Sequence, residues 1–204
     1  MKLVLALVCF ASTASALPID FIHVVDGQTM PRSEVRRVIL GVKKAYESLH
    51  LARYGAVIQW GRLRSKRVGF GPGEMKDRLA YSYRLLKRLR QKRPVYVFVP
   101  MSTDGYSWGY CLSRSFAVGT ATSFNLRGED RYLFSVTTAV HEIGHMLGQS
   151  HSDNEVNVMH SDALRFVTDR IPPWGWWARD MILWFGFGID ICRVKKNYCL
   201  EAHD

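Results

Sequence analysis

The chain has 204 residues, of which 48% are hydrophobic and 23% charged, and its 28 lysines and arginines outnumber its 18 acidic residues by ten. These fractions exclude a disordered chain, a collagen-like repeat and a coiled coil, and the length suits one domain with its own core. The basic balance points to an anionic partner, such as nucleic acid, a membrane surface or an acidic polysaccharide, without choosing among them.

The N-terminus has the pattern of a secretory signal peptide. A positive start at Lys2 precedes the apolar run Leu3–Phe10 and the small-residue cleavage signal Ala14-Ser15-Ala16. The run is too short to cross a bilayer, which needs roughly 20 residues. We therefore predict that residues 1–16 are a signal peptide and that the mature chain is secreted and extracellular. With this location we expect no nucleic-acid partner and no membrane span.

Three cysteines remain after Cys9 leaves with the signal peptide. An oxidising environment favours one disulfide among Cys111, Cys192 and Cys199. Cys192 and Cys199 could close a small C-terminal loop and leave Cys111 free, or Cys111 could pair with either of them. The sequence leaves this pairing open.

The mature chain alternates strand and helix signals, which is typical of an α/β fold. Ile19–Val25 predicts a first strand, and Ala56–Trp60 predicts a second. Between them we expect a helix capped by Thr29, with Pro31 in its first turn. Its apolar residues recur at helical spacing and are Val35, Val38, Ile39, Val42, Tyr46 and Leu49.

The second half of the chain continues this alternation. Val95–Pro100 is apolar like a buried strand, and Ser115–Phe124 is a weaker strand that Gly119 interrupts. A second strong helix is predicted for Arg131–Leu147, and a last one near Trp177–Phe185.

A block of like charge lies between the second and third predicted strands. Residues 62–93 contain twelve lysines and arginines against Glu74 and Asp77. In a helix here, we expect one face to bury Leu79, Tyr83 and Leu86, with four cations outward: Arg84, Lys87, Arg88 and Lys92. Charge of one sign repels itself unless a partner relieves it, so we predict an anionic exosite for sulfated glycans or acidic protein surfaces rather than a merely solvated face.

The strongest chemical signal comes at the end of the second strong helix. His141, Glu142, His145, Gly148 and His151 match H-E-x-x-H-x-x-G-x-x-H. The first two histidines project from one helix face, and the glycine is a helix-ending turn that can bring the third histidine back as a ligand. Three of the chain's seven histidines fall in this window, which makes chance a weak explanation.

This donor set predicts one catalytic zinc. Three neutral imidazoles from His141, His145 and His151 leave the fourth tetrahedral position for water, and imidazole suits zinc. Zinc lowers the pKa of bound water toward roughly 7, and Glu142 can take the proton as general base for attack on a peptide carbonyl. The predicted enzyme is a zinc metalloendopeptidase, a hydrolase.

The motif resembles that of the metzincin zinc peptidases and, within them, the matrixins. Ser152 follows the third histidine, as is common in matrixins, and Val158-Met159 is similar to the Met-turn that places a methionine, here Met159, beneath the zinc. Met30–Val35 and Phe134–Ala139 also resemble matrixin segments.

The resemblance implies a zincin-like α/β (α+β) fold. Such a fold has a twisted, mostly parallel sheet with an antiparallel edge strand, an active-site helix, a Met-turn and a C-terminal helix. Ser115–Ala121 occupies the place of the edge strand to which an extended peptide adds. The catalytic domain would span residues 17–188 with a basic insertion at 62–93, followed by a C-terminal extension at 189–204.

Two departures from the matrixin pattern affect cofactors and regulation. The family's stretch for structural zinc and calcium corresponds to Gly119–Asn125, which lacks the histidine and the acids. We therefore expect no second zinc and leave calcium open. No propeptide with a zinc-blocking cysteine follows Ala16, so we do not expect latency by that route.

The prediction is a secreted zinc-dependent endopeptidase that hydrolyses extracellular proteins through a zinc-bound water activated by Glu142. The alternative is a catalytically weak protein with a metzincin shell that binds acidic glycans or proteins through its basic surface. Intact ligands and an intact Glu142 favour the enzyme.

Overall fold

The computed structural model describes residues 15–48, 56–69, 77–101, 108–113, 115–120, 127–147, 149, 151 and 158–160. Within these ranges the elements follow one another in the order β1-α1-β2-α2-β3-β4-β5-α3. The strands form one sheet ordered β2-β1-β3-β5-β4, and all neighbours are parallel except the antiparallel pair β4/β5. The predicted α/β fold with a mostly parallel sheet and an antiparallel edge strand is confirmed.

Most predicted elements are present with shifted ends. Helix α1 buries the predicted apolar stripe of Val35, Val38, Ile39, Val42 and Tyr46, whereas Leu49 lies outside the described residues. β2 is longer than predicted because its second half, although polar, continues to pair with β1. The observed bounds are β1 Ser15–Val24, α1 Arg32–Ser48, β2 Ala56–Lys66, β3 Val95–Val99 and α3 Gly128–Met146.

The prediction that Ser115–Ala121 forms the edge strand is wrong. β5, Phe116–Thr120, lies inside the sheet between β3 and β4, and all five of its residues are buried. The edge is β4, Gly109–Ser113, which the sequence analysis did not predict. This strand is short, begins with glycine and is only partly buried, so its pattern carries little strand signal.

The predicted buried face of the helix in the basic block is also wrong. α2, Arg78–Leu89, buries Tyr81, Leu85 and Leu89, while Leu79 and Tyr83 remain 44% and 42% exposed. Both apolar sets have helical spacing, so periodicity alone could not choose the face that meets the sheet.

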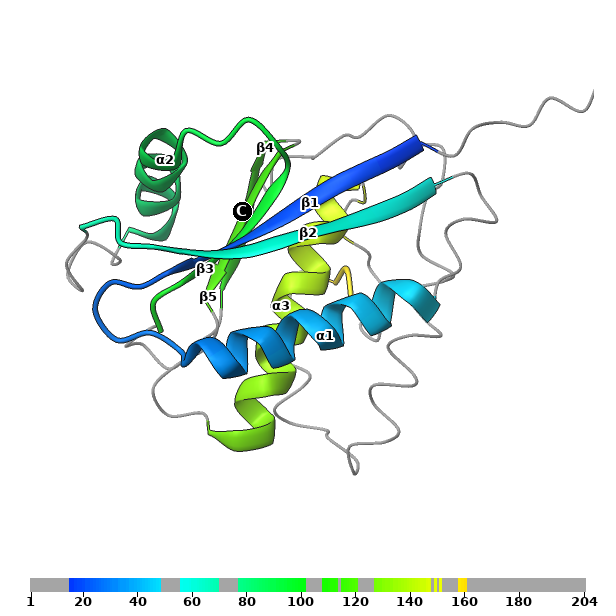
Figure 1. Cartoon of the computed structure of the whole chain (residues 1–204), viewed down its shortest axis with the longest axis horizontal. Coiled ribbons are helices and arrows are strands. Elements are labelled where there is room, and N and C mark those ends of the chain that lie inside the picture. Colours follow the sequence, from blue (N-terminus) through cyan, green and yellow to red (C-terminus); the bar gives the residue numbers. More distant parts are fainter. Residues whose placement is uncertain are drawn as a thin grey trace, which may run out of the picture.

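Helices cover both faces of the sheet (Figure 1). α1 and α3 pack on one face over a core that includes Phe21 and Phe98, and α2 packs on the other over Ile22 and Val97. Residues 62–93 are thus part of the architecture, since they supply the end of β2 and the helix that closes the second face.

Contacts along α1 fix the position of α3, which carries the site. The Tyr46 hydroxyl donates to the Val140 carbonyl at 2.8 Å, and Arg131 pairs with Glu34 at 2.9 Å. Where the helices cross, Gly41 leaves room for the Tyr132 ring, because a Cβ at residue 41 would lie 2.5 Å from the Tyr132 hydroxyl. These contacts hold α3 against α1 on the same face of the sheet.

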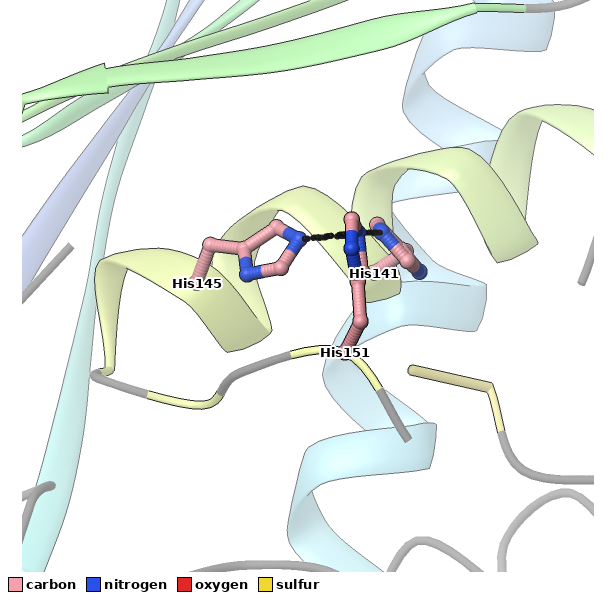
Figure 2. Close-up of side chains that lie close together, drawn as sticks. All are labelled: His141, His145 and His151. Atoms are coloured by element: carbon pink, nitrogen blue, oxygen red, sulfur yellow. Dashed lines mark hydrogen bonds between the residues drawn. The ribbon is translucent and has the colours of Figure 1, made fainter. Parts of the chain in front are cut away.

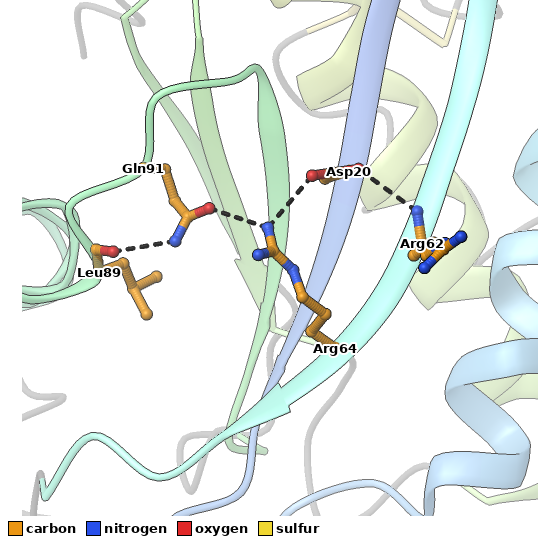
Figure 3. A network of polar contacts seen from close by, with 5 residues as sticks. All are labelled: Asp20, Arg62, Arg64, Leu89 and Gln91. Atoms are coloured by element: carbon orange, nitrogen blue, oxygen red, sulfur yellow. Dashed lines mark hydrogen bonds and ion pairs between the residues drawn. The ribbon is translucent and has the colours of Figure 1, made fainter.

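An aspartate on β1 organises the opposite edge of the sheet. The β1/β2 register shifts between Ile19 and Phe21, and at this bulge Asp20 accepts from the Arg62 amide at 3.3 Å and from the Arg64 side chain at 3.1 Å. Arg64 also donates to Gln91 at 3.1 Å, whose amide donates to the Leu89 carbonyl (Figure 3). The network links β1 and β2 to the end of α2.

The remaining sequence predictions fall partly beyond the described residues. The C-terminal helix near 177–185 and the extension 189–204 lie there, and so does most of the signal segment. Ser15 and Ala16 pair with Ala56 and Val57. Cleavage after Ala16 would remove these two pairs and retain the β1/β2 pairing from Leu17 onward. None of the described helices has the length and apolar content to cross a membrane.

Cys111 on β4 is part of a disulfide, and its partner lies outside the described residues. Of the pairings that the sequence left open, this favours those in which Cys111 is bonded.

Gly61→Ala should destabilise the protein by about 1–3 kcal/mol through overpacking. The new Cβ would lie 2.9 Å from the Asp20 Cγ and 3.1 Å from its Cα, so the carboxylate must leave its place at the bulge. Urea unfolding would measure the loss. In an Asp20→Ala background the same substitution should cost less, because the crowded carboxylate is gone. Fully additive losses would contradict this account of the bulge.

Candidate metal centre

The last turns of α3 place two histidines on one side of the helix. His141 is half-buried and His145 is only 2% exposed. The helix closes as Leu147 donates to Ile143 and Gln149 donates to Gly144, each at 3.0 Å. The predicted helix-ending Gly148 lies outside the described residues, so its role stays a prediction. His151, beyond the end of α3, lies beside His141 and His145.

The three imidazoles meet through the same ring atom (Figure 2). The Nε2 atoms of His141 and His145 are 3.0 Å apart. The Nε2 atom of His151 lies 3.3 Å from that of His141 and 3.2 Å from that of His145. A zinc ion with Zn–N bonds of about 2.0–2.1 Å would hold tetrahedral nitrogen neighbours about 3.3 Å apart. The observed spacing therefore fits three ligands of one such ion.

Hydrogen bonds on the far side of two rings fix which nitrogen carries the proton. His141 Nδ1 donates to the Val158 carbonyl and His145 Nδ1 to the Gln149 carbonyl, both at 2.7 Å. In a neutral ring this leaves each Nε2 as a bare acceptor. Two acceptors 3.0 Å apart cannot satisfy each other, and a single proton from His151 could serve only one of them. A shared cation satisfies all three, so the donor set fits a metal.

The electrostatics of the site keep these ligands neutral. Burial lowers the pKa of His141 to about 3, with the neighbouring His145 as the next cause, and burial lowers the pKa of His145 to about 4. At neutral pH both rings are therefore in the form that binds metal.

Glu142 lies beneath the sheet edge. It is 5% exposed, and its Oε2 has no hydrogen-bond partner among the residues that the structure describes. Burial raises its pKa to about 8 in the metal-free chain. A bound cation would favour the ionised carboxylate that a general base requires.

Two glycines paired across β4 and β5 make room for this carboxylate and for a buried phenol. Gly109 pairs with Gly119. A Cβ at residue 109 would lie 2.5 Å from the Glu142 Cγ and 2.6 Å from its Cδ, and one at residue 119 would overlap the Tyr96 hydroxyl. Burial, and secondarily the Glu142 charge, raises the pKa of Tyr96 well above its usual range. The sheet thus accommodates both groups only where it lacks side chains.

The predicted Met-turn is a turn at residues 158–160, in which Met159 is buried in the core shared by α1 and α3. Its neighbour Val158 supplies the carbonyl that orients His141. His160 is close enough to His141 to lower the pKa of that ring. The turn therefore supports the site directly, and a specific role for Met159 beneath a metal stays a prediction.

Sequence reasoning missed the orienting carbonyls of Gln149 and Val158, and also Gly109 and Tyr96. No sequence signal marks a carbonyl acceptor, since every residue has one. Gly109 lies on a strand with little sequence signal, so its place beside Glu142 became visible only with the sheet topology.

Comparison with solved structures finds two proteins of similar fold at low sequence identity. The chain is similar to metalloproteinase-II from Bacteroides fragilis, with a TM-score of 0.52 and 16% identity over 74% of this chain and 47% of that one. It is also similar to archaemetzincin from Methanopyrus kandleri, with a TM-score of 0.50 and 15% identity over 94% of this chain and 98% of that one.

These similarities define a zincin-like fold. At this level of identity they carry the architecture alone, and the chain spans about half the length of the Bacteroides protein. No protein-family model and no curated protein matches the sequence.

Glu142→Gln should stabilise the metal-free protein, and the gain should grow between pH 5 and pH 8. The raised pKa means that the folded chain holds the Glu142 proton more tightly than the unfolded chain, so stability is lost as pH rises from about 4.5 toward 8. Glutamine has no proton to lose. Thermal unfolding in excess chelator would measure the difference. A gain that is the same at both pH values would contradict the buried, raised-pKa carboxylate.

Proposed function

We propose that this protein is a zinc-dependent endopeptidase in which His141, His145 and His151 hold the metal and Glu142 is the general base. The observation that carries the proposal is the convergence of three Nε2 atoms at 3.0–3.3 Å, two of them fixed as bare acceptors. Similarity to metalloproteinases in fold supports it.

The residues divide the chemistry between them. A zinc ion held here would supply a Lewis acid that polarises water and a substrate carbonyl. Glu142 accepts the proton of the attacking water and returns it to the leaving amine. The carbonyls of Val158 and Gln149 keep the ligand rings oriented and make them better donors.

The substrate is an extended polypeptide that adds to β4. This strand is the sheet edge nearest Glu142, since Gly109 contacts that side chain. Within the described residues no strand pairs with its outer side. An added peptide would gain main-chain hydrogen bonds and bring a scissile carbonyl past the carboxylate.

The finer predictions remain proposals. We propose that the enzyme is secreted, acts on extracellular proteins and is related to the matrixins through Ser152 and the Met-turn at Met159. The boundaries at residues 17–188 and the absence of a second zinc belong to the same proposal, and calcium stays open.

The competing function is a zincin shell that binds acidic glycans or proteins without appreciable catalysis. Its support is the basic segment 62–93 rather than anything at the histidines. The two functions differ in their need for Glu142, because binding through a basic surface does not require a general base.

The purified protein should contain about one zinc per chain and cleave peptides until the metal is chelated. Glu142→Gln should keep the metal and lose at least about 10²-fold in kcat/KM, since it lacks a base. Metal analysis and a peptide-library cleavage assay measure both. Glu47→Gln, on the exposed side of α1, is the control and should cleave normally. A metal-free chain that takes up no zinc, or a fully active Glu142→Gln variant, would overturn the proposal.

Gly109→Ala should lower kcat by about tenfold or more while zinc content stays unchanged, because a displaced base costs rate without touching the ligands. The new Cβ lies 2.5–2.6 Å from Glu142 side-chain carbons, so that side chain must move. Gly41→Ala is the control. Its Cβ would make a similarly close contact with Tyr132, which lies on α3 but far from Glu142 along the helix, so kcat should stay unchanged. Equal losses in the two variants would show general strain rather than a displaced base.

A further inference from the structure

We propose that the end of β2 and the C-terminal half of α2 form a binding surface for sulfated glycans, separate from the metal centre. We call it the cationic surface and define it as residues 62–69 and 84–93. It is independent of the peptidase proposal, since it includes none of the histidines or Glu142.

Charge is the first observation. Residues 62–69 carry four lysines and arginines and residues 84–93 carry six, and neither range contains an aspartate or glutamate. Eight of these ten cations are exposed. Among the residues that the structure describes, Asp20 of β1 pairs with Arg64. The surface therefore retains a large excess of positive charge.

The fold brings the two ranges together. Arg64 of β2 donates to Gln91, which follows α2, and Arg88 of α2 donates to the Val68 carbonyl at 2.8 Å, just after β2. Arg64 and Lys66 pair in the β1/β2 ladder with Ile22 and Val24, whose side chains belong to the core beneath α2. Arg64 and Lys66 therefore lie on the same face of the sheet as α2.

This like charge is held in place at an energetic cost. Repulsion among fixed cations destabilises the folded state unless counter-ions or an anionic partner relieve it. Two of the arginines are themselves structural, since they bind Asp20 and the Val68 carbonyl, so the charge cannot simply move apart. A polyanion would relieve the repulsion of the whole surface at once.

The arrangement suits an extended ligand rather than a single small anion. The stretch Arg62–Lys66 alone extends over about 13 Å at a strand rise of about 3.3 Å per residue. Seven of the ten cations are arginines, whose planar fork matches oxyanions such as sulfate in a bidentate way. Beside them, α2 exposes the Tyr83 ring, which can lie against a sugar face.

Predicted secretion selects the class of polyanion. The N-terminal signal pattern points to an extracellular location, where sulfated glycans rather than nucleic acids are the abundant linear polyanions. The surface also lies on the face of the sheet opposite to α3, as Figure 1 shows for α2. A glycan bound there leaves β4 and the histidines accessible, so it would anchor the protein rather than compete with a substrate.

A fourfold variant, the surface variant, tests the cationic surface. It replaces exposed cations outside the Arg64 and Arg88 contacts: Arg67→Gln, Lys87→Gln, Lys92→Gln and Arg93→Gln. The matched control removes four cations from α1 and the start of α3: Arg36→Gln, Lys43→Gln, Lys44→Gln and Arg127→Gln. Both variants lose the same net charge. Binding to immobilised heparin in about 0.15 M salt, where screening acts over about 8 Å, is the measurement.

We expect the surface variant to bind heparin at least about tenfold more weakly and the control to stay within about twofold, because contacts with a polyanion act locally and release counter-ions. Chelator and Glu142→Gln should leave heparin binding unchanged, and the surface variant should cleave a short neutral peptide normally if the peptidase proposal holds. Thermal unfolding verifies that both variants fold.

Several results would overturn the proposal. Equal weakening in both variants would mean attraction by net charge alone, and unchanged binding in the surface variant would remove the site. Retention on desulfated heparin equal to that on heparin would exclude sulfate as the recognised group. Stronger competition by duplex DNA than by heparin would assign the surface to nucleic acid instead.

Discussion

Two hydrogen bonds from imidazole to backbone determine what the metal centre can be. The carbonyls of Gln149 and Val158 each accept an Nδ1 proton, which turns Nε2 of His145 and His141 toward each other with lone pairs exposed. Both carbonyls belong to the chain after α3, so the site forms only when that chain folds back over the helix. Burial then keeps the rings neutral, because water that would stabilise the charged imidazolium is excluded.

The same burial makes Glu142 costly to the metal-free fold. A carboxyl group without a described partner, in a space bounded by Gly109, prefers to be protonated at neutral pH. A divalent cation nearby reverses that preference and restores the anion. Metal binding would thus release a proton from Glu142. The buried carboxyl group destabilises the metal-free chain, and it serves the reaction only in the metal-bound chain. Functional sites often combine local destabilisation with activity in this way.

The sequence predicts the site better than the frame around it. His141, His145 and His151 are recognisable because helical periodicity and one glycine suffice to bring them together. The stripe of α1, with Val38 and Val42 buried, follows from periodicity as well. The buried face of α2 does not follow from periodicity, since two sets of apolar residues have helical spacing. Only packing against the sheet determines which set is buried.

The edge of the sheet was beyond sequence reasoning for a different reason. Strand order is a long-range property. β4, the outer strand, is less apolar than β5 and carries too little strand signal to be recognised from its sequence. The place of Gly109 against Glu142 depends on that order, so the residue that makes room for the base could not be assigned before the topology was known.

The order of the strands also separates two kinds of chemistry. β4 and β2 are the two edges of the sheet, and four inter-strand steps of about 4.8 Å place them roughly 19 Å apart before the twist is considered. One edge lies beside a buried carboxylate and neutral imidazoles, where low charge and exclusion of water favour a metal. The other carries a concentration of cations held by Asp20 and by the Val68 carbonyl. The cations of α2 lie on the face of the sheet opposite to α3, so the sheet separates them from Glu142. A fold that joined the two on one edge would oppose cation binding at the histidines.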